Sequence, residues 1–361
     1  MMKDEPISYL QLLFLIMMSS GFYNHVIIGP PILDAAKRDA WISSLMTTFS
    51  FTVILIIIYI IHRITKDQSV LQYIQNSLGK VGKILFAIPI LVYVILSGYI
   101  TYFDTVTWTN ISYLPKTPKI YLGILTILVI LVILRGGMQT LAITAGVLLP
   151  LVVVLGFFVT IANMGNKEYN LLFPVLAEGW EPVWRGFLLG SGGALDLGFI
   201  LLIQHQVKKK MSFWKYIIIG AVLVNLLVTP VMGSIAMFGP EHASELRYPA
   251  YEQWRMVTVG TYISHVDYFT IYQWLSGAII RIALVAHLIP YLFPIKTEKA
   301  KWRIQMCFLS GLLLSLYLPL SDMQFLNLLK DFVLPWIVYA MGTYLFVLLV
   351  VIATIHRRKA T

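Results

Sequence analysis

Two charged residues stand inside long apolar runs of this chain. Arg281 lies in WLSGAIIRIALVAHL with apolar neighbours on both sides, and Asp196 lies in GSGGALDLG, residues 190–198. If these runs cross a bilayer, a charge at the helix centre costs about 2.5–3.5 kcal/mol on insertion scales, so it must face protein or water and have a partner. Asp196 is the partner that we expect for Arg281.

The two residues are compatible with two roles. They could form a structural ion pair that joins two helices, or the guanidinium could receive an anionic ligand, because its planar fork binds both oxygens of a carboxylate. The two roles can also alternate in one protein, and the sequence leaves both open.

The stretch GSGGALDLG also predicts an interrupted helix. Its four glycines are Gly190, Gly192, Gly193 and Gly198, and glycine is a weak helix former. An interruption inside a membrane leaves backbone N–H and C=O groups that can bind a polar solute. The alternative is that the glycines only allow neighbouring helices to approach closely.

A second weak point occurs in the first apolar run. Here the sequence is SSGFYNH, residues 19–25, followed by GPP, residues 29–31. Interruptions in the first and sixth of ten spans are typical of transporter folds built from two five-helix repeats of inverted topology. A lone histidine such as His25 is more often a hydrogen-bonded structural residue than a proton carrier.

Other polar residues give weaker signals. Tyr93, Ser97 and Gly98 lie in the third apolar run and could line the same cavity, although a tyrosine in a helix bundle is more often a packing residue. The sequence contains no metal-binding cluster, phosphate-binding loop or nucleophile with a plausible base. We therefore expect no catalytic residues, no metal and no cofactor, and a membrane-embedded enzyme is the least favoured function.

Composition places these residues in a membrane protein. Of 361 residues, 58% are hydrophobic and 12% are charged, and the mean hydropathy is +0.80. The net charge of +10 does not indicate nucleic acid, because the basic residues form short clusters between apolar runs. The single cysteine, Cys307, cannot form an internal disulfide.

The apolar runs predict an all-α integral membrane protein of ten transmembrane helices, in one domain that spans residues 1–361. No linker is long enough to separate two domains. The expected spans are 7–31, 41–62, 84–108, 120–134, 138–162, 183–204, 213–238, 268–293, 304–319 and 325–355.

The distribution of basic residues predicts the orientation. With the N-terminus inside, 17 of the 27 Lys and Arg residues fall on the inner face and 9 on the outer face, and Arg281 lies within a span. The positive-inside rule then places both termini in the cytoplasm.

Two connecting segments are more than turns. Residues 67–83 carry Val70, Leu71, Ile74 and Leu78 at helical spacing, which predicts an amphipathic helix on the inner membrane surface. Residues 239–267 mix charged and aromatic side chains and are expected to fold back against the outer mouth. That outer segment either braces the bundle or acts as a moving gate.

Several motifs resemble the B-type subunits of spore nutrient germinant receptors. The segment NLLFPVLAEG, residues 170–179, is similar to a segment before helix six in that family, and HQVKKK, residues 205–210, is similar to the basic turn after it. Tyr248–Pro249, the run 260–270 and the turn Leu78-Gly-Lys80 also match in order and spacing. The similarity covers most of the chain.

The resemblance implies the broken-helix fold of amino acid–polyamine–organocation transporters, also described as LeuT-like. It implies a germinant-sensing subunit that binds a small nutrient, often an amino acid, at the midplane of the spore inner membrane. The implied partners are a larger A-type membrane subunit and a C-type lipoprotein. The implied ligand-binding residues are Gly21, Tyr23, Asn24, His25, Tyr93, Ser97, Gly98, Gly190, Ser191, Gly192, Gly193, Leu195, Asp196 and Arg281.

The chain departs from the family pattern at two places. Tyr23, Asn24 and His25 stand where relatives usually have a glycine-rich turn, and Arg281 stands where a small or neutral polar residue is expected. Both departures add bulk or charge to the expected pocket. The rival function is a working amino acid permease coupled to H⁺ or Na⁺, since one fold serves both.

Overall fold

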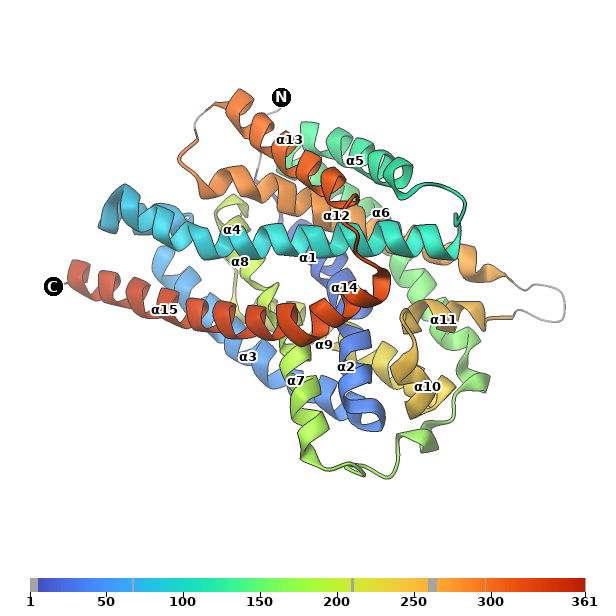
Figure 1. The fold of residues 1–361 in the computed structure, drawn as a ribbon. Helices are drawn as coiled ribbons and strands as arrows, with labels where there is room; N and C mark the ends of the chain where they lie inside the picture. Colours follow the sequence, from blue (N-terminus) through green and yellow to red (C-terminus); the bar gives the residue numbers. More distant parts are fainter. Residues whose placement is uncertain (1–5, 67, 209–210, 259–264, 296, 361) are drawn as a thin grey trace.

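The computed structural model describes residues 6–66, 68–208, 211–258, 265–295 and 297–360, and within these ranges the chain forms helices and no strand. The α-helices are α1 (Tyr9–Phe22), α2 (Gly29–Ala36), α3 (Ala40–Thr65), α4 (Val70–Ser112), α5 (Lys119–Arg135), α6 (Gly137–Ala162), α7 (Trp180–Leu195), α8 (Gly198–Ile203), α9 (Phe213–Phe238), α10 (Pro240–Glu245), α11 (Pro249–Arg255), α12 (Phe269–Leu288), α13 (Glu298–Ser315), α14 (Asp322–Leu328) and α15 (Leu334–Ala360) (Figure 1). Two π-helical segments, η1 (Tyr23–Ile28) and η8 (Leu329–Val333), and six 3₁₀ segments, η2 (Lys37–Asp39), η3 (Met164–Asn166), η4 (Tyr169–Leu172), η5 (Gln204–Gln206), η6 (Val266–Tyr268) and η7 (Ile289–Leu292), complete the described structure.

The helices identify an integral membrane protein. Among the described residues, seven helical stretches are long and apolar enough to cross a membrane. They are Tyr9–Thr65, Val70–Ser112, Gly137–Ala162, Trp180–Gln206, Phe213–Phe238, Val266–Leu292 and Asp322–Lys359.

This number is smaller than the ten spans expected from the sequence, for two reasons. The stretch Tyr9–Thr65 has 57 residues, about 85 Å of helix at 1.5 Å per residue, whereas a bilayer core is about 30 Å thick. It also contains a turn at Lys37, which has φ 42°, so α2 and α3 are separate elements. The helix α5 has only 17 residues, and the first turns of α13 carry Glu298, Lys299, Lys301 and Arg303. Ten crossings therefore stay a prediction.

The first apolar run is wound into a wider helix rather than unwound. Ser8 begins α1 with a capping box, in which its Oγ accepts from the Gln11 N–H and its own N–H donates to Gln11 Oε1. The π-helical segment η1 then precedes Gly29, Pro30 and Pro31. Proline has no N–H to bond the carbonyl four residues earlier, which favours a wide turn at this point. The regular α-helix is therefore interrupted here, as expected, but the interruption is a π-helical segment rather than unwound backbone.

The glycine-rich stretch contains an interruption that is shorter than expected. Residues 190–195 form the last turns of α7, and the helix stops only at Asp196 and Leu197 before α8 begins at Gly198. Within the interruption, the Leu197 N–H donates to the Ala194 carbonyl at 3.1 Å, which is a tight turn. The expectation that the glycines themselves unwind the helix is wrong.

The predicted amphipathic segment forms the first part of α4. The chain kinks at Gly79, where φ is 73°, a conformation that residues with a Cβ rarely adopt. Before the kink, Val70, Leu71 and Ile74 are buried, while Leu78 is 47% exposed. The helix therefore buries most of its apolar stripe, and its position on a membrane surface stays a prediction.

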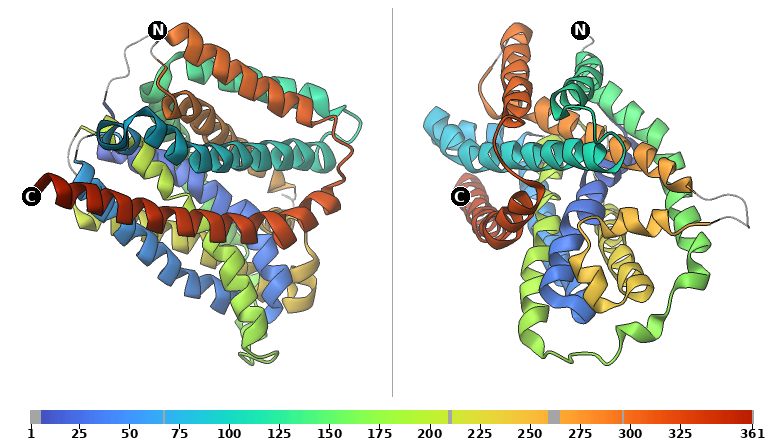
Figure 2. Two further views of the ribbon diagram at one scale, coloured as in Figure 1. Left: turned by 60° about the vertical axis from the view of Figure 1, so that its left-hand side comes forward. Right: turned by 45° about the vertical axis from the view of Figure 1, so that its right-hand side comes forward.

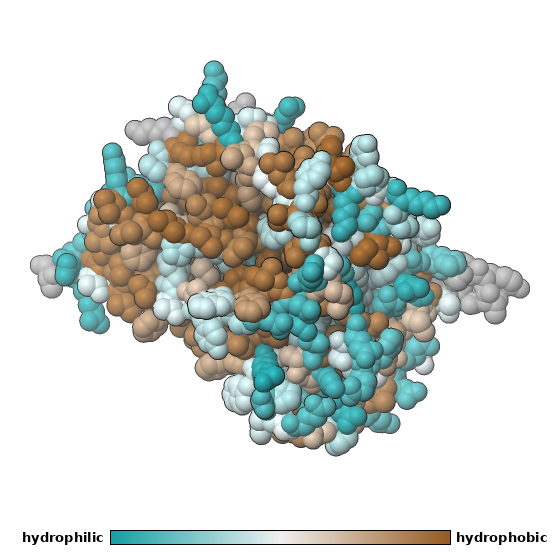
Figure 3. All heavy atoms as spheres, in the orientation of Figure 1, coloured by the Kyte–Doolittle hydropathy of each residue, from teal (hydrophilic) through white to brown (hydrophobic). Residues whose placement is uncertain are grey.

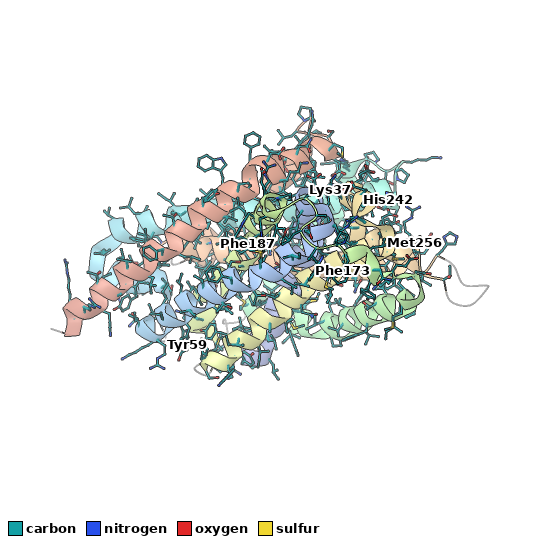
Figure 4. The ribbon with its side chains drawn as sticks, turned by 90° about the horizontal axis from the view of Figure 1, so that it is seen from below. Lys37, Tyr59, Phe173, Phe187, His242 and Met256 are labelled. Atoms are coloured by element: carbon teal, nitrogen blue, oxygen red, sulfur yellow. The ribbon has the colours of Figure 1, made fainter. Side chains whose placement is uncertain are left out.

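The segment 239–267 folds against α9 and α2 through the two short helices α10 and α11. Lys37 at the end of α2 pairs with Glu241 of α10 at 3.0 Å. Figure 4 shows Lys37, His242 and Met256 near one end of the molecule and Tyr59 near the other. Part of this segment, residues 259–264, lies outside the described residues, as do Lys209 and Lys210 of the basic turn. Its role as a brace or a gate stays open.

Several long helices that are distant in sequence pack against each other (Figure 2). α1 packs on α6, and α7 packs on α15. α3 packs on α7, and α9 packs on α1. α12 packs on both α6 and α5, and α4 packs on both α15 and α13. One continuous apolar core runs through these contacts.

The outer surface is apolar over the flanks of the bundle. Val81, Leu85, Val132, Val147 and Trp336 are each more than 60% exposed. Figure 3 shows hydrophobic residues over the face around α4 and α15, while hydrophilic residues gather around α10 and the beginning of α7. This distribution fits a protein whose flanks face lipid.

Candidate functional site

The centre of the site is Arg281 on α12, which has no solvent exposure. Its Nε donates to Thr101 Oγ1 at 3.0 Å, and its Nη1 donates to the Ser19 carbonyl at 3.2 Å and to Asp196 Oδ2. Its Nη2 donates to Ser97 Oγ at 2.7 Å and to Asp196 Oδ1 at 3.0 Å. A guanidinium has five N–H donors, so every donor of Arg281 is used.

The carboxylate of Asp196 occupies the turn between α7 and α8 and is also fully buried. Both of its oxygens accept from Arg281, and Oδ1 also accepts from the Tyr93 hydroxyl. The expected pairing of Asp196 with Arg281 is confirmed. This bidentate geometry is the strongest form of an arginine–carboxylate contact.

Two aromatic rings flank the guanidinium. Its Cζ lies 4.1 Å from the centre of the Tyr23 ring and 5.7 Å from the centre of the Phe199 ring. An arginine over an aromatic face is stabilised by about 0.5–2 kcal/mol, with the larger values at desolvated sites. The rings also separate the charge from water.

The pair joins four parts of the chain: α1 with η1, α4, the turn between α7 and α8, and α12, which carries Arg281. Ser19 comes from α1, Tyr23 from η1, Ser97 from α4 and Asp196 from the turn after α7. Removing one partner of such a buried pair costs about 3–5 kcal/mol, because the other charge is left uncompensated. The arrangement is therefore a closed, electrically neutral junction between four parts of the chain.

Five of the predicted site residues meet at this junction: Tyr23, Tyr93, Ser97, Asp196 and Arg281. Asn24 lies beside it, and its Nδ2 donates to the Ser20 carbonyl at 2.8 Å and to the Gly193 carbonyl at 3.4 Å. These contacts give the π-helical segment a direct link to the glycine-rich end of α7.

The five predicted glycines face neighbouring parts of the chain. The position of a Cβ at Gly21 is 2.9 Å from Leu226 of α9, at Gly98 it is 2.7 Å from Phe308 of α13, and at Gly190 it is 2.6 Å from Thr47 of α3. A Cβ at Gly192 would contact Leu334, and a Cβ at Gly193 would overlap with the side chain of Asn24. The close-packing role of these glycines is thus borne out by their surroundings.

Three further predicted residues have structural contacts. Ser191 Oγ donates to the Phe187 carbonyl at 2.8 Å and lies 3.1 Å from Ser50 Oγ. Leu195 is buried in the core. His25 Nδ1 lies 3.4 Å from the Leu226 carbonyl, a hydrogen bond that agrees with the structural role expected for this histidine.

Three residues that contact Arg281 are not among the predicted site residues: Ser19, Thr101 and Phe199. One signal was present, since Thr101 follows Ser97 by four residues and therefore lies on the same helix face. The backbone carbonyl of Ser19 carries no signal in the sequence at all.

Buried side-chain oxygen atoms without hydrogen-bond partners lie in the π-helical segment and just before it. Within the described structure, Ser19 Oγ, Ser20 Oγ and Asn24 Oδ1 are buried and have no hydrogen-bond partner. An unsatisfied buried polar atom costs about 1–3 kcal/mol. Such atoms beside a buried charge pair are suited to a polar ligand that supplies the missing bonds.

A second ionic cluster joins α4, α14 and the segment between α10 and α11. Arg247 Nη2 lies 2.5 Å from Asp104 Oδ1 and 3.0 Å from Asp322 Oδ1, and Arg247 Nε lies 3.1 Å from both Asp322 oxygens. Burial lowers the pKa of Arg247, but the negative charges of Asp104 and Asp322 raise it by more, so its pKa lies above its ordinary value. Arg247 therefore remains a cation.

An aromatic stack lies between the two ionic centres. Trp108 of α4 and Trp274 of α12 are stacked with ring centres 4.1 Å apart, two turns along their helices from Thr101 and Arg281. Tyr248 contacts Trp274, with ring centres 5.6 Å apart, and its hydroxyl lies 3.4 Å from Asp322. The stack thus joins α4 to α12 beyond the central junction.

Among the residues that the structure describes, no group of three or more His, Cys, Asp or Glu side chains is arranged to hold a metal ion. The site itself consists of a buried ion pair with hydroxyl and carbonyl partners.

Residues 6–325 match the sequence profile of a family described as spore germination protein. The chain is 36% identical to spore germination protein XB of Bacillus anthracis over 356 residues, which cover 98% of this chain and 99% of that protein. It is 25% identical to the putative spore germination protein YfkT of Bacillus subtilis (strain 168) over 265 residues, 72% of this chain and 71% of that protein.

Proposed function

This chain belongs to the spore germination protein family, and from that premise we propose that it is the germinant-sensing membrane subunit of a spore nutrient receptor. It binds a small nutrient at the Arg281 junction and signals to partner subunits. The observation that carries the proposal is the saturated Arg281–Asp196 pair, which holds four parts of the chain together without solvent.

The fold that we propose is ten crossings in two five-helix halves of inverted topology. In this arrangement α1–α2 corresponds to α7–α8, α3 to α9, α4 to α12, α5 to α13, and α6 to α15. Three matched pairs support it: α1 with α6 and α7 with α15, α3 with α7 and α9 with α1, and α12 with α6 and α4 with α15. A fourth is the packing of α5 on α12 and of α13 on α4. Sites at the interface of such halves lie near the bilayer midplane.

The ligand that suits this junction carries a carboxylate, as an amino acid does. Asp196 shows that the guanidinium accepts a carboxylate in a bidentate manner. A ligand carboxylate can replace it, and the unpaired oxygens of Ser19, Ser20 and Asn24 can accept hydrogen bonds from the ammonium group of the same ligand.

Exchange of the two carboxylates would release the turn between α7 and α8. Asp196 would then keep only its bond from Tyr93, and the turn before α8 would lose its ion pair with α12. A ligand shifts the protein toward this state only if it binds the released state more tightly than the closed one. The change in α8 is the signal that we propose is passed to the partners.

The proposed partners are an A-type membrane subunit and a C-type lipoprotein, in the spore inner membrane with both termini on the core side. The excess of basic residues on the side of the termini supports this orientation. We further propose that the chain has no catalytic activity.

The test uses spores in which this chain is the only member of its family. Each of the twenty proteinogenic L-amino acids is added singly, and germination is followed as the loss of optical density. In Arg281→Gln spores we expect a half-saturating concentration at least about tenfold higher, because hydrogen bonds to a charged group contribute about 1.5–3 kcal/mol. Immunoblots of spore membranes verify that the subunit is present.

Three outcomes separate the alternatives. A normal concentration dependence with Arg281→Gln protein present would remove the junction as the ligand site. If the Arg281→Gln protein is absent but the Arg281→Gln/Asp196→Asn protein is present and responds normally, the pair is only structural. Uptake of the responding amino acid by the purified chain in liposomes would assign a permease instead.

A further inference from the structure

A pocket of about 440 Å³ opens at the end of the molecule where α4 begins, far along α4 from the aromatic stack. Its walls come from the first turns of α4, from η7 with the residues that follow it, and from α13. It lies outside the Arg281 junction, and none of the residues that line it contacts the Arg281 guanidinium.

Lys83 is the decisive residue of this pocket. Its side chain lines the cavity although the residue is only 7% exposed. No described residue forms an ion pair or a hydrogen bond with its ammonium group, and no aspartate or glutamate lines the cavity. A buried ammonium without an anion is unfavourable, so the cavity is suited to an anion brought from outside.

The position of Lys83 follows from the kink in α4. Gly79, with φ 73°, turns the helix between its short first part and its long second part. Ser69, Gln72 and Gln75 before the kink and Lys83 after it therefore line one cavity. The kink thus brings a cation to the beginning of its own helix.

The beginning of α4 adds further donors. Ser69 is the N-cap residue, yet its side chain makes no capping hydrogen bond, and the first N–H groups of a helix have no partners within it. Helix N-termini bind anions through these N–H groups and the helix dipole. Gln72, Gln75 and Ser69 can also donate, so the polar wall is rich in donors.

Apolar side chains also line the cavity, which adjoins the lipid-facing side of the bundle. They include Leu71, Leu202, Leu288 and Phe293, and they stand beside the polar lining residues His205, Tyr291 and Lys301. On α4, Val81 and Leu85 are close in sequence to Lys83 and are 70% and 61% exposed. A cavity lined both by basic and by apolar side chains suits an amphiphilic anion.

We propose that this pocket binds a phosphate group, held by the Lys83 ammonium and the N-terminus of α4. Lipid headgroups and free phosphate share this chemistry. The apolar lining residues and the exposed apolar residues beside Lys83 favour the phosphodiester of an anionic phospholipid such as phosphatidylglycerol.

The test measures binding by the purified full chain in a non-ionic detergent. The probes are phosphatidylglycerol, phosphatidylcholine and inorganic phosphate, and affinity is obtained from the ligand dependence of the thermal unfolding midpoint. We expect phosphatidylglycerol to bind and Lys83→Met to weaken that binding at least about tenfold, since bonds to charged groups are the stronger ones.

Matched variants keep the result interpretable. Lys80→Met removes an exposed lysine three residues earlier on the same helix and should change the affinity less than about twofold. Lys83→Arg keeps the charge and should retain most of the binding. The unfolding midpoint of each variant without ligand reports any loss of folding.

Each outcome decides the proposal. Lys83-dependent binding of phosphatidylglycerol supports it with a lipid source, and Lys83-dependent binding of inorganic phosphate alone supports it with a soluble source. Equal affinities for the native chain and a folded Lys83→Met variant, or equal losses in Lys83→Met and Lys80→Met, overturn it. If Lys83→Met does not fold, unimpaired binding by Lys83→Gln would overturn it in the same way.

Discussion

At the residue scale, the central junction is decided by one side chain with five donors. Arg281 satisfies all of them through two hydroxyls, one carbonyl and one carboxylate. Lysine has a similar charge but three donors on a compact head, so it cannot reproduce this set. The junction therefore depends on the five donors of the arginine side chain as well as on its positive charge.

Glycine substitutions at the end of α7 test how closely the helices approach. In Gly193→Ala the new Cβ would lie 1.9 Å from Asn24 Oδ1, so Asn24 must move from its bond to the Ser20 carbonyl. We expect a loss of about 1–3 kcal/mol in the free energy of unfolding, as for other overpacked sites. Thermal unfolding of the purified chain in detergent measures it.

Gly198→Ala is the matched control for that substitution. No atom lies within 4 Å of its new Cβ, and α8 begins at this residue. Alanine should leave stability unchanged or raise it by up to about 1 kcal/mol. Equal losses of stability in Gly193→Ala and Gly198→Ala would mean that the contact between Asn24 and Gly193 is not the cause of the loss.

At the element scale, the two interruptions show what a sequence does and does not reveal. The pairing of Arg281 with Asp196 could be predicted, because a charge in an apolar run must find a partner. The π-helical form of 23–28 could not, because Pro30 and Pro31 remove N–H donors but do not say how the chain accommodates their loss. The glycines of α7 were expected to unwind it, yet packing against Thr47 and Asn24 keeps them helical.

Some polar contacts of the junction could likewise be predicted from the sequence, and others could not. Ser97 and Tyr93 were found because they are polar residues in an apolar run. The carbonyl of Ser19 depends on the register between α1 and α12, which only the packed structure determines. Sequence thus predicts which side chains need partners, and tertiary packing selects the partners.

The segment between α10 and α11 gives a test at this scale. Arg247→Ala leaves the buried carboxylate of Asp104 without its cation, and breaking such pairs costs about 3–5 kcal/mol. Since the Arg247 side chain is 15% exposed, we expect the lower end of that range. Hydrogen exchange should accelerate in α10 and α11 but not in α9.

Arg255→Ala is the control for Arg247→Ala. Arg255 is 56% exposed and pairs with Glu252 three residues earlier on the same helix. Its loss should cost less than about 1 kcal/mol and leave exchange in α10 unchanged. If both variants accelerate exchange equally, the Arg247 cluster does not hold this segment.

At the scale of the whole molecule, the distribution of basic residues predicts the orientation. The single native Cys307 allows a clean test after Cys307→Ser. In intact cells, a membrane-impermeant maleimide should label Arg185→Cys at the beginning of α7 and should label Arg358→Cys at the end of α15 only after permeabilisation. Both side chains are exposed. Labelling of both residues from outside would contradict the proposed ten crossings.

In the proposed receptor, the hydrogen bonds that occupy all donors of Arg281 also affect the nutrient concentration needed for a response. If only about 1% of the molecules have the pair open, the apparent dissociation constant for a nutrient is about 100-fold weaker than the intrinsic one. In the proposed receptor, the strength of this one ion pair would set the nutrient concentration at which half of the molecules respond. Substitutions around Asp196 that leave the proposed nutrient contacts unchanged should therefore raise or lower this concentration.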